Sequence, residues 1–339
     1  MRIWFNKTFS TISAVFNNLR QSFPAGEITL ICTHVHLGAT AFLAADECYL
    51  EPENLKGDAY VDWCLNFCQQ QRISVFWPGK EAALLSLQHA KFAEHGIQIL
   101  SVADFDTLNL LHDKAAFYQQ LPTAVAEVMD FIAINDLASF DLALAELGAK
   151  HPQLCIKPAV SVYGLGFKVL DTQRNSITQI LKGIEYQIPL AELRYGMQTS
   201  TQFPTLLVME HLAGVEWSVD CAGLHGELLC AVQRKKAPQA GYGQSIDNQP
   251  EITGMVQRLT QHYRLNGIFN IQFKAGQHGP RLLEINPRPS GGFGMACLAG
   301  VNLAGVALQA ALGQRPPIPA IDYGLRVSEV NTPVVLKSN

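Results

Sequence analysis

The 339-residue sequence has little charge: only 16% of its residues are Asp, Glu, Lys or Arg, and the net charge is −4. It therefore offers no electrostatic footprint for nucleic acid, which usually appears as a basic patch or a high pI. Low charge does not mean disorder here, because 48% of the residues are hydrophobic, as in ordinary globular proteins. A globular chain of this length is expected to form two or three compact units.

The sequence also lacks a metal-binding pattern of cysteines. Of its eight cysteines, only Cys64 and Cys68 form a close pair, and no second Cys or His pair follows them. A spacing of four residues within a helical pattern predicts that the two thiols pack on one face of a helix. We expect reduced thiols and a cytoplasmic protein.

A run suited to crossing a membrane is missing as well. Lys7 interrupts the N-terminus before a signal-peptide core is complete. Residues 289–314 are uncharged, but they consist largely of Ala and Gly and contain Asn302 and Gln309, whereas a spanning helix is normally richer in Leu, Ile, Val and Phe. We expect no membrane partner, and instead a buried helix that begins beyond Met295.

Strands and helices alternate over the first hundred residues, which indicates an open parallel α/β sheet. A nicotinamide-binding domain would place a G-x-G-x-x-G turn after the first strand, but the turn "NKTFST" has no glycine, which argues against an oxidoreductase. The expected strands are 1–6, 27–34, 73–79 and 97–102, and the expected helices are 11–23, 58–72 and 82–96.

After residue 105 the pattern changes to helices followed by strands with short turns, which indicates an α+β arrangement. The two expected helices are followed by a short strand broken by Pro158. Two strand-like runs are then joined by a tight turn at His225 and Gly226, and a second hairpin follows. The expected helices are 105–121 and 136–151, the runs are 205–223 and 226–236, and the hairpin strands are 267–276 and 281–287.

The second hairpin is the strongest candidate for a site. Folding it about Gln277 and His278 sets polar residues opposite one another on one face, because opposed residues have Cβ atoms about 5 Å apart. Oxygen ligands with a single carboxylate suit Mg²⁺ bound to nucleotide phosphates, although a polar face without metal remains the alternative. The polar face carries Asn270, Gln272, Glu284 and Asn286, and the apolar face carries Phe269, Ile271, Phe273, Leu283 and Ile285.

Phosphates bound near such a metal also need cations and backbone N–H groups. Lys114 lies in "HDKAAF", and Lys157 ends an apolar strand in "CIKPAV"; a lysine so placed either extends its ammonium to water or pairs with an anion. Gly164 and Gly166 in "YGLGF" permit close approach to phosphate oxygens. Solvated lysines and a plain hairpin turn are the alternative interpretation of each feature.

The order of these motifs resembles the ATP-grasp superfamily, and within it the carbamoyl-phosphate-synthetase-like members. The resemblance comprises an α/β region, "DK", "IKP" with a glycine loop, "VMEHLAGVEWSVD", "IQF" and "LLEINPRPSGG". It implies an N-terminal α/β (pre-ATP-grasp) domain over 1–105, an ATP-grasp small subdomain over 106–185 and a C-terminal subdomain with the metal site over 186–339. The loop has two glycines where the family commonly has three or more.

The resemblance also implies a role for each matching residue. Lys114 and Lys157 would reach the phosphates and base of ATP, Glu210 would face the adenine amino group, and Glu216 would hold the ribose, although both acids could be surface residues of a strand. The backbone at His211 and Leu212 would contact the base. Mg²⁺ (or Mn²⁺) would be held by Gln272, Glu284 and Asn286, and Arg288 would stabilise the transferring phosphoryl group.

The activity implied is that of an ATP-dependent ligase, which activates a carboxylate as an acyl phosphate and couples it to an amine. Arg234 is a candidate for holding a substrate carboxylate or phosphate, and a solvated basic turn is its alternative. Gly291 and Gly292 are expected to allow positive φ and a close backbone approach to a bound acid or acyl phosphate, and a plain loop is the alternative. Lid candidates are 161–167 and 236–245. The alternatives are a ligase using bicarbonate or another small acid, and a non-catalytic ATP sensor or scaffold; a homodimer is the commonest closed assembly.

Overall fold

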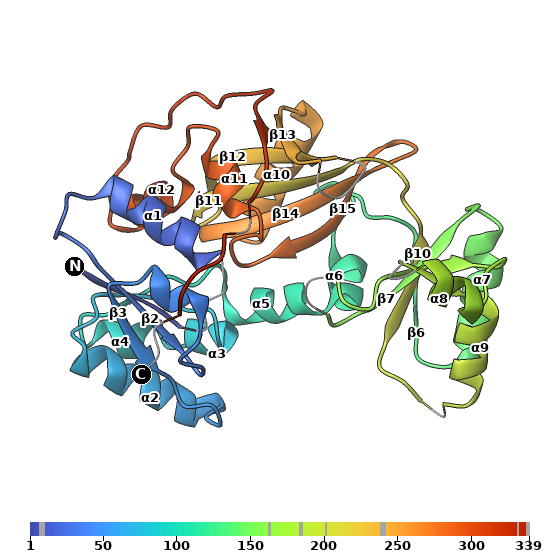
Figure 1. Cartoon of the computed structure of the whole chain (residues 1–339), viewed down its shortest axis with the longest axis horizontal. Helices are drawn as coiled ribbons and strands as arrows, with labels where there is room; N and C mark the ends of the chain where they lie inside the picture. Colours follow the sequence, from blue (N-terminus) through green and yellow to red (C-terminus); the bar gives the residue numbers. More distant parts are fainter. Residues whose placement is uncertain are drawn as a thin grey trace. The chain divides into compact units, whose positions relative to one another are not determined.

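The structure is a computed structural model that describes residues 1–6, 11–161, 164–182, 186–200, 202–237, 242–330 and 332–336. The chain forms two compact units, each built from separate stretches of sequence (Figure 1). Unit 1 comprises residues 1–109, 215–273 and 284–339, and unit 2 comprises residues 110–214 and 274–283.

These units divide the chain differently from the three domains expected from the sequence. The expected boundary after residue 105 lies close to the observed one after 109. The expected boundary after residue 185 would cut through a sheet of unit 2, because the strands on its two sides pair with each other. The division therefore falls after residue 214 instead.

The N-terminal part of unit 1 is the expected open parallel sheet. Its strand order is β3-β2-β1-β4-β5, and all neighbouring strands are parallel. The short strand β3 was not predicted, because its residues alternate between half-buried and exposed and its apolar signal is weak. The strands are β1 (Arg2–Asn6), β2 (Thr29–His34), β3 (Glu47–Leu50), β4 (Val75–Trp77) and β5 (Gln98–Ile99).

Aromatic packing fixes this sheet against its helices. The Trp4 ring stacks on Phe76 with centroids 4.0 Å apart, and both side chains are fully buried. Cys64 and Cys68 are also fully buried, which confirms the prediction that they pack on one helix face. The predicted helix over 82–96 is split in two. The helices are α1 (Ile12–Ser22), α2 (Gly57–Gln70), α3 (Ala82–Ser86) and α4 (His89–Ala93), with a 3-10 turn η1 (Thr40–Leu43).

The second sheet has six strands in the order β15-β14-β11-β12-β13-β16. The tight turn between β11 and β12 falls at His225 and Gly226 as predicted, and both residues have positive φ, 50° and 96°. The second hairpin turns at residues 277–278, also as predicted. The strands are β11 (Glu216–Leu224), β12 (Glu227–Lys236), β13 (Gln244–Asp247), β14 (Gly267–Gly276), β15 (Gly279–Asn286) and β16 (Arg326–Val327).

One hydrophobic core joins the two sheets of unit 1. It contains Phe16 of α1, Phe5 of β1, Val232 of β12 and Leu308 of α12, among other buried residues. The uncharged stretch lies in this core as two helices, α11 (Phe293–Cys297) and α12 (Leu303–Ala311), not as the single helix expected beyond Met295. Within the described parts of the chain, every helix is too short or too polar to cross a bilayer. Unit 1 also contains α10 (Pro250–His262).

Unit 2 is built on a five-stranded mixed sheet in the order β6-β10-β7-β8-β9. Its neighbours pair antiparallel except β8 and β9, which are parallel. Phe140 of α7 and Met197 of α9 are buried in its hydrophobic core. The strands are β6 (Phe131–Ile134), β7 (Leu154–Pro158), β8 (Lys168–Asp171), β9 (Gln187–Pro189) and β10 (Leu206–Glu210), and the helices are α6 (Lys114–Gln120), α7 (Leu137–Gly148), α8 (Ser176–Lys182) and α9 (Leu190–Gln198).

Two predicted elements of this region are divided in the structure. The helix expected over 105–121 is two helices, α5 (Phe105–His112) and α6, because the Asp113 side chain accepts hydrogen bonds from Ala115 N and Ala116 N and so caps a new helix. The strand-like run over 205–223 is also two elements. Its first half, β10, belongs to the sheet of unit 2, and its second half, β11, belongs to the six-stranded sheet.

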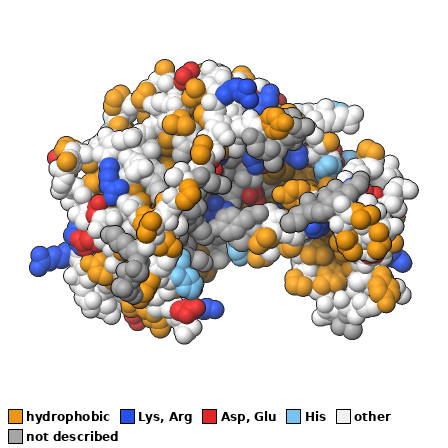
Figure 2. Space-filling model, in the orientation of Figure 1, with side chains coloured by type: hydrophobic (Ala, Val, Ile, Leu, Met, Phe, Trp, Pro, Cys, Tyr) orange, Lys and Arg blue, Asp and Glu red, His pale blue; other side chains and the backbone are white. Residues whose placement is uncertain are grey.

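The surface of the molecule mixes side chains of different kinds. On the face in Figure 2, Lys and Arg side chains alternate with Asp and Glu, and hydrophobic side chains lie between them. Several large apolar side chains are exposed on unit 2, among them Leu142 and, on α8, Ile177, Ile180 and Leu181.

Candidate functional site

The end of β15 brings three of the predicted site residues together. Asn286 Nδ2 donates a hydrogen bond to Glu284 Oε1 at 2.9 Å. Arg288 Nη2 donates to Asn286 Oδ1 at 3.4 Å, a long contact, and its Nη1 donates to Pro289 O at 3.1 Å. All three side chains are half-buried, whereas Ile285, between the first two, is buried.

Gln272 lies on β14, the neighbouring strand of the hairpin. Its side chain is half-buried, whereas Ile271 and Phe273 on either side are fully buried. The predicted apolar face is therefore confirmed for these residues. Leu283 of β15 is only half-buried, so it contributes less to the core than expected.

The donor set of this face fits a hard divalent cation. It offers one carboxylate and two amide oxygens, and Mg²⁺ takes oxygen ligands and commonly keeps water or substrate phosphate as further ligands. Within the described stretches, no group of three or more His, Cys, Asp or Glu side chains could hold a metal ion. A cation on this face would therefore depend on the amide oxygens of Gln272 and Asn286 as well as on Glu284.

Asn270 lies on the same face of β14 as Gln272 but has different surroundings. It is fully buried, and its Nδ2 donates to Ser218 Oγ at 3.0 Å, to Val219 O at 3.0 Å and to Asp220 Oδ1 at 3.1 Å. Its Oδ1 accepts no hydrogen bond within the described residues. Asn270 thus lies on the predicted face of β14 but belongs to a buried polar cluster, whereas Gln272 on the same face is half-buried.

Arg234 of β12 is the centre of that cluster. Its Nε and Nη2 both donate to Asp220 Oδ2, at 2.9 and 2.8 Å, and the two side chains are only 2% and 0% exposed. Nη2 also donates to Ser218 Oγ at 3.0 Å and to Ser290 Oγ at 2.7 Å, and Nη1 donates to Gln244 Oε1. The basic turn considered as the alternative for Arg234 is wrong, because the guanidinium is buried. Its predicted contact with substrate stays a prediction.

Gly291 and Gly292 do not have the conformation expected of them. Neither has positive φ, and Gly292 has φ −96° and ψ 18° at the start of α11. A Cβ on Gly292 would lie 2.7 Å from Arg234 Cζ and 2.8 Å from Met295 Cε, whereas a Cβ on Gly291 would meet nothing within 4 Å. Glycine is therefore required at 292 because the guanidinium of Arg234 packs against the backbone.

The two predicted lysines lie in unit 2 and contact their own unit. Lys114 begins α6 and is buried, and its Nζ donates to Ser161 O at 2.9 Å. Lys157 of β7 is half-buried; its Nζ donates to Tyr118 Oη at 2.8 Å and lies 5.1 Å from the centre of that ring. Tyr118 in turn donates to Leu283 O. The contacts link α6 and the hairpin to β7.

The end of β10 carries Glu210, His211 and Leu212. Glu210 Oε1 lies 3.7 Å from His151 Nδ1, and the other ring nitrogen of His151 lies 2.8 Å from Asp130 Oδ2. His211 N donates to Gln153 O at 3.0 Å.

The surroundings of His211 disfavour its charged form. Burial lowers the pKa of His211, and the positive charge of Lys274 lowers it further. Leu212 is buried.

The remaining predicted residues are Glu216, Gly164, Gly166 and those of the expected lids. Glu216 begins β11 in unit 1, and its carboxylate forms an ion pair with Lys236. Gly164 and Gly166 have φ 68° and 81°, and a Cβ on Gly166 would lie 2.7 Å from Pro158 Cδ. In the expected lids, residues 162–163 and 238–241 lie outside the described residues.

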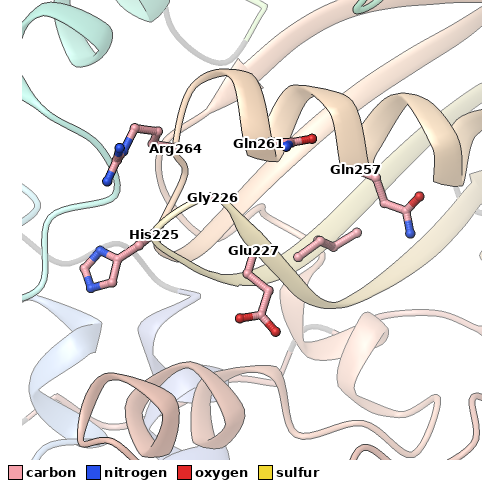
Figure 3. A pocket seen from close by; sticks show the side chains of 7 residues that line it. His225, Gly226, Glu227, Gln257, Gln261 and Arg264 are labelled. Carbon is pink, nitrogen blue, oxygen red and sulfur yellow. The ribbon is translucent and has the colours of Figure 1, made fainter.

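A further surface pocket lies at the turn between β11 and β12, where it meets the end of α10. Its volume is about 650 Å³, and Figure 3 shows His225, Glu227 and Arg264 spread around it. None of the predicted site residues lines it. The side chains do not converge on one point in this view, so the pocket does not suggest a particular ligand.

Sequence reasoning missed the partners of the predicted residues. Tyr118, Asp220 and Ser290 were not singled out, yet each contacts a predicted site residue. Asp220 had a signal: it is a lone acid in the apolar run "WSVDCAG", and a charge in such a run must be paired when it is buried. Ser290 had no such signal.

Part of the chain matches a known protein family. Residues 202–333 match the family model described as ATP-grasp in the biosynthetic pathway with Ter operon. The large chain of arginine-specific carbamoyl phosphate synthase from Geobacillus stearothermophilus is 23% identical over 317 residues, which cover 90% of this chain and 28% of that one. Carnosine synthase 1 from Homo sapiens is 34% identical over 132 residues, covering 34% of this chain and 16% of that one. The chain therefore spans less than a third of either relative.

The fold has close counterparts among solved structures. The biotin carboxylase domain of 2-oxoglutarate carboxylase from Hydrogenobacter thermophilus, solved as a dimer with MgADP, ADP and bicarbonate, matches with a TM-score of 0.66 at 15% identity, covering 95% of this chain and 72% of that one. At this identity the match shows the fold only. Residues 202–333 therefore match an ATP-grasp family, and the chain shares its fold with the biotin carboxylase domain.

Proposed function

We propose that the chain is an ATP- and Mg²⁺-dependent ligase that activates a carboxylate as an acyl phosphate and couples it to an amine. The proposal depends chiefly on the contacts at the end of β15, where Glu284, Asn286 and Arg288 lie together on a half-buried face. One carboxylate with amide oxygens suits a metal that also binds phosphates. A guanidinium beside it suits the charge that develops on a transferring phosphoryl group.

The residues present match the demands of the reaction. A carboxylate is a poor electrophile because its leaving group would be oxide, and phosphorylation by ATP gives it a good leaving group. This step needs positioning and charge neutralisation more than acid–base groups. Bound Mg²⁺ would neutralise phosphate charge. Glu284, Asn286 and Gln272 would hold the ion, and Arg288 would orient the phosphoryl group.

The nucleotide roles fall on residues of unit 2 and on Glu216. Lys114 and Lys157 would donate to phosphate oxygens or to the base, as the resemblance implies, and Tyr118 would orient the ammonium of Lys157. Glu210 would accept from the adenine amino group while the backbone at His211 and Leu212 contacts the ring edge. Glu216 would exchange its ion pair with Lys236 for hydrogen bonds to the ribose. Gly164 and Gly166 would approach the phosphates.

The relatives support the class of reaction and leave its substrates open. Carnosine synthase is by its name a synthase, but this chain covers only 16% of it, so its substrates do not transfer. Bicarbonate is the second candidate for the acid, because the solved biotin carboxylase domain holds bicarbonate together with MgADP. We propose small-molecule substrates, a cytoplasmic location and a homodimer.

The experiment that tests the function is ADP release. The protein is incubated with MgATP and, in separate arms, with pooled carboxylic acids and amines, with bicarbonate and an amine pool, and with either pool alone. We expect ADP release that requires both an acid and an amine. Stimulation by bicarbonate would instead select the second candidate. Tight ATP binding without stimulation by any pool would contradict the ligase proposal and leave an ATP sensor or scaffold.

A matched pair of variants assigns the activity to the site. Glu284→Gln removes the only carboxylate of the predicted metal ligands, so ADP release should fall by about 100-fold or more, by analogy with the loss of a key electrostatic group. Glu94→Gln removes a carboxylate from an exposed position after α4 and should leave ADP release unchanged. Equal activity of the two variants would show that the metal is held elsewhere.

A further inference from the structure

The segment that follows Arg288 is anchored to the buried polar cluster of unit 1. We call Ser218, Asp220, Arg234, Gln244, Asn270 and Ser290 the Arg234 cluster. Ser290 is only 4% exposed, although it lies in a connection outside the sheet, between β15 and α11. Its hydroxyl accepts from Arg234 Nη2 at 2.7 Å, which is among the shortest hydrogen bonds of the cluster.

The Arg234 cluster contains a fully buried ion pair, formed by Arg234 and Asp220. Moving a guanidinium and a carboxylate out of water costs several kcal/mol each, and a buried ion pair is weak evidence for added stability. Such a pair is better explained when it fixes a conformation. Here one guanidinium connects β11, through Asp220, to the start of β13, through Gln244, and to Ser290.

The connection around Ser290 is fixed on both sides. Before it, Arg288 N donates to Asn286 O at 2.7 Å, and Arg288 Nη1 donates to Pro289 O at 3.1 Å. After it, Phe293 N donates to Ser290 O at 3.2 Å. The absence of a Cβ at Gly292 lets the guanidinium of Arg234 pack against the same turn. The path of the backbone from Arg288 to Phe293 therefore depends on where Arg234 lies.

We infer that Arg234 and Asp220 are positioning residues, which hold Ser290 and through it the orientation of Arg288. Asp220 holds the guanidinium through two of its nitrogen atoms, and Arg234 then donates to the loop. The inference rests on the proposed function, because it assigns to Arg288 a contact with the transferring phosphoryl group. It differs from the sequence prediction, in which Arg234 itself holds the substrate.

The test needs no knowledge of the acid or the amine. MgADP with aluminium fluoride mimics a nucleotide whose terminal phosphoryl group is in transfer, whereas MgADP alone does not. The ratio of the two dissociation constants, measured by titration calorimetry, therefore reports on the groups around the transferring phosphoryl. We expect the wild-type protein to bind MgADP more tightly when aluminium fluoride is present.

Two serine variants separate positioning from stability. Ser290→Ala removes the contact between Arg234 and the loop, and Ser218→Ala removes an equally buried acceptor of the same Nη2 atom, on β11. Both should lower the melting temperature. Only Ser290→Ala should reduce the ratio of the two dissociation constants, by about tenfold, because a charge-assisted contact is lost. Its affinity for MgADP alone should stay within about twofold of the wild-type value. Ser290→Thr, which keeps the hydroxyl, should restore much of the ratio.

Four results would overturn the inference. If Ser290→Ala has the same ratio of dissociation constants as the wild type, the loop does not need Arg234. An equal loss in Ser290→Ala and Ser218→Ala would reduce the cluster to a structural role. If the wild type binds MgADP but aluminium fluoride adds nothing, Arg288 does not contact the phosphoryl group. Failure to bind MgADP at all would instead contradict the proposed function, and the inference with it.

Discussion

Asn270 and Gln272 lie two residues apart on the same face of β14, yet only one of them is covered. Asn270 is fully buried beside Arg234 and Asp220, and Gln272 is half-buried. Period-two alternation assigns both to one face but cannot say what lies over it. The comparison shows that a row of polar residues on a strand can contain a buried cluster and an accessible site side by side.

The two carboxylates of these regions differ in the same way. Asp220 is 0% exposed and accepts from Arg234 and Asn270. Glu284 is half-buried and accepts from the neutral amide of Asn286. Removing the first should therefore affect folding, and removing the second should affect binding. The difference can be tested by the effect of single substitutions on the free energy of unfolding, which should range from large for Asp220 to small for Glu284.

The largest loss of stability is expected from Asp220→Ala, because it leaves the guanidinium of Arg234 buried without its counter-charge. Breaking a buried pair on one side is destabilising by about 3–5 kcal/mol. Urea denaturation of the wild type and the variant measures the difference. A loss under about 1 kcal/mol, the value of an exposed pair, would mean that water reaches the cluster.

Gly292→Ala should come next. The added Cβ would meet Arg234 Cζ at 2.7 Å and Met295 Cε at 2.8 Å, and overpacking of this kind is destabilising by about 1–3 kcal/mol. Gly291→Ala is the matched control, because nothing lies within 4 Å of its Cβ. Both free energies of unfolding come from the same denaturation experiment. Equal values for the two variants would contradict the close packing of Arg234 against residue 292.

The ion pair of Glu47 and Arg2 provides a third, partly exposed carboxylate. Hydrogen bonds from Arg2 and Tyr49 lower the pKa of Glu47 to about 2. The side chains of Glu47 and Arg2 are 35% and 27% exposed. Because the pKa is lower in the folded state, the stabilisation is present at neutral pH and is lost as the pH falls from about 4.5 towards 2. Exposure limits it to about 1 kcal/mol or less.

Comparing the wild type with Glu47→Gln in urea between pH 7 and about pH 3 measures this contribution. The difference in the free energy of unfolding should shrink as the pH falls. A difference that stayed constant over that range would show that the ion pair does not set the pKa.

Glu284→Gln should have the smallest effect on stability and a large effect on binding. The change keeps the shape of the side chain and removes its charge, so the free energy of unfolding should change by no more than about 0.5 kcal/mol. Binding of Mn²⁺ in the presence of ADP, followed by electron paramagnetic resonance, should weaken strongly. Unchanged Mn²⁺ affinity would place the metal elsewhere, and a large loss of stability would make Glu284 a structural residue like Asp220.

Local patterns explain which parts of the fold could be predicted. Alternating strands and helices gave the parallel sheet, and the turns at His225–Gly226 and at residues 277–278 gave both hairpins, because turns and periodicity are encoded within a few residues. The run over 205–223 looked continuous, but it divides between two sheets. Nothing within the run fixes which sheet each half joins, because that depends on residues far away in the sequence.

The same limit applies to the candidate site. The order of Glu284, Asn286 and Arg288 along one strand was enough to predict that they lie together, and they do. The burial of Arg234 was not predictable from "VQRKK", because a basic run normally lies in water. Its burial follows from Asp220 on the adjacent strand and from Ser290, which is 56 residues away in the sequence.

The hydrophobic core that joins the two sheets of unit 1 also limits the order in which the chain can fold during synthesis. Phe16 of α1 packs in one core with Phe293 of α11 and Leu308 of α12, so the ribosome must synthesise the chain as far as α12 before α1 is fully covered. Until then the apolar side of α1 remains available to chaperones or to other chains. A fragment ending near residue 109 would keep that surface exposed permanently, and it is the fragment that we expect to aggregate.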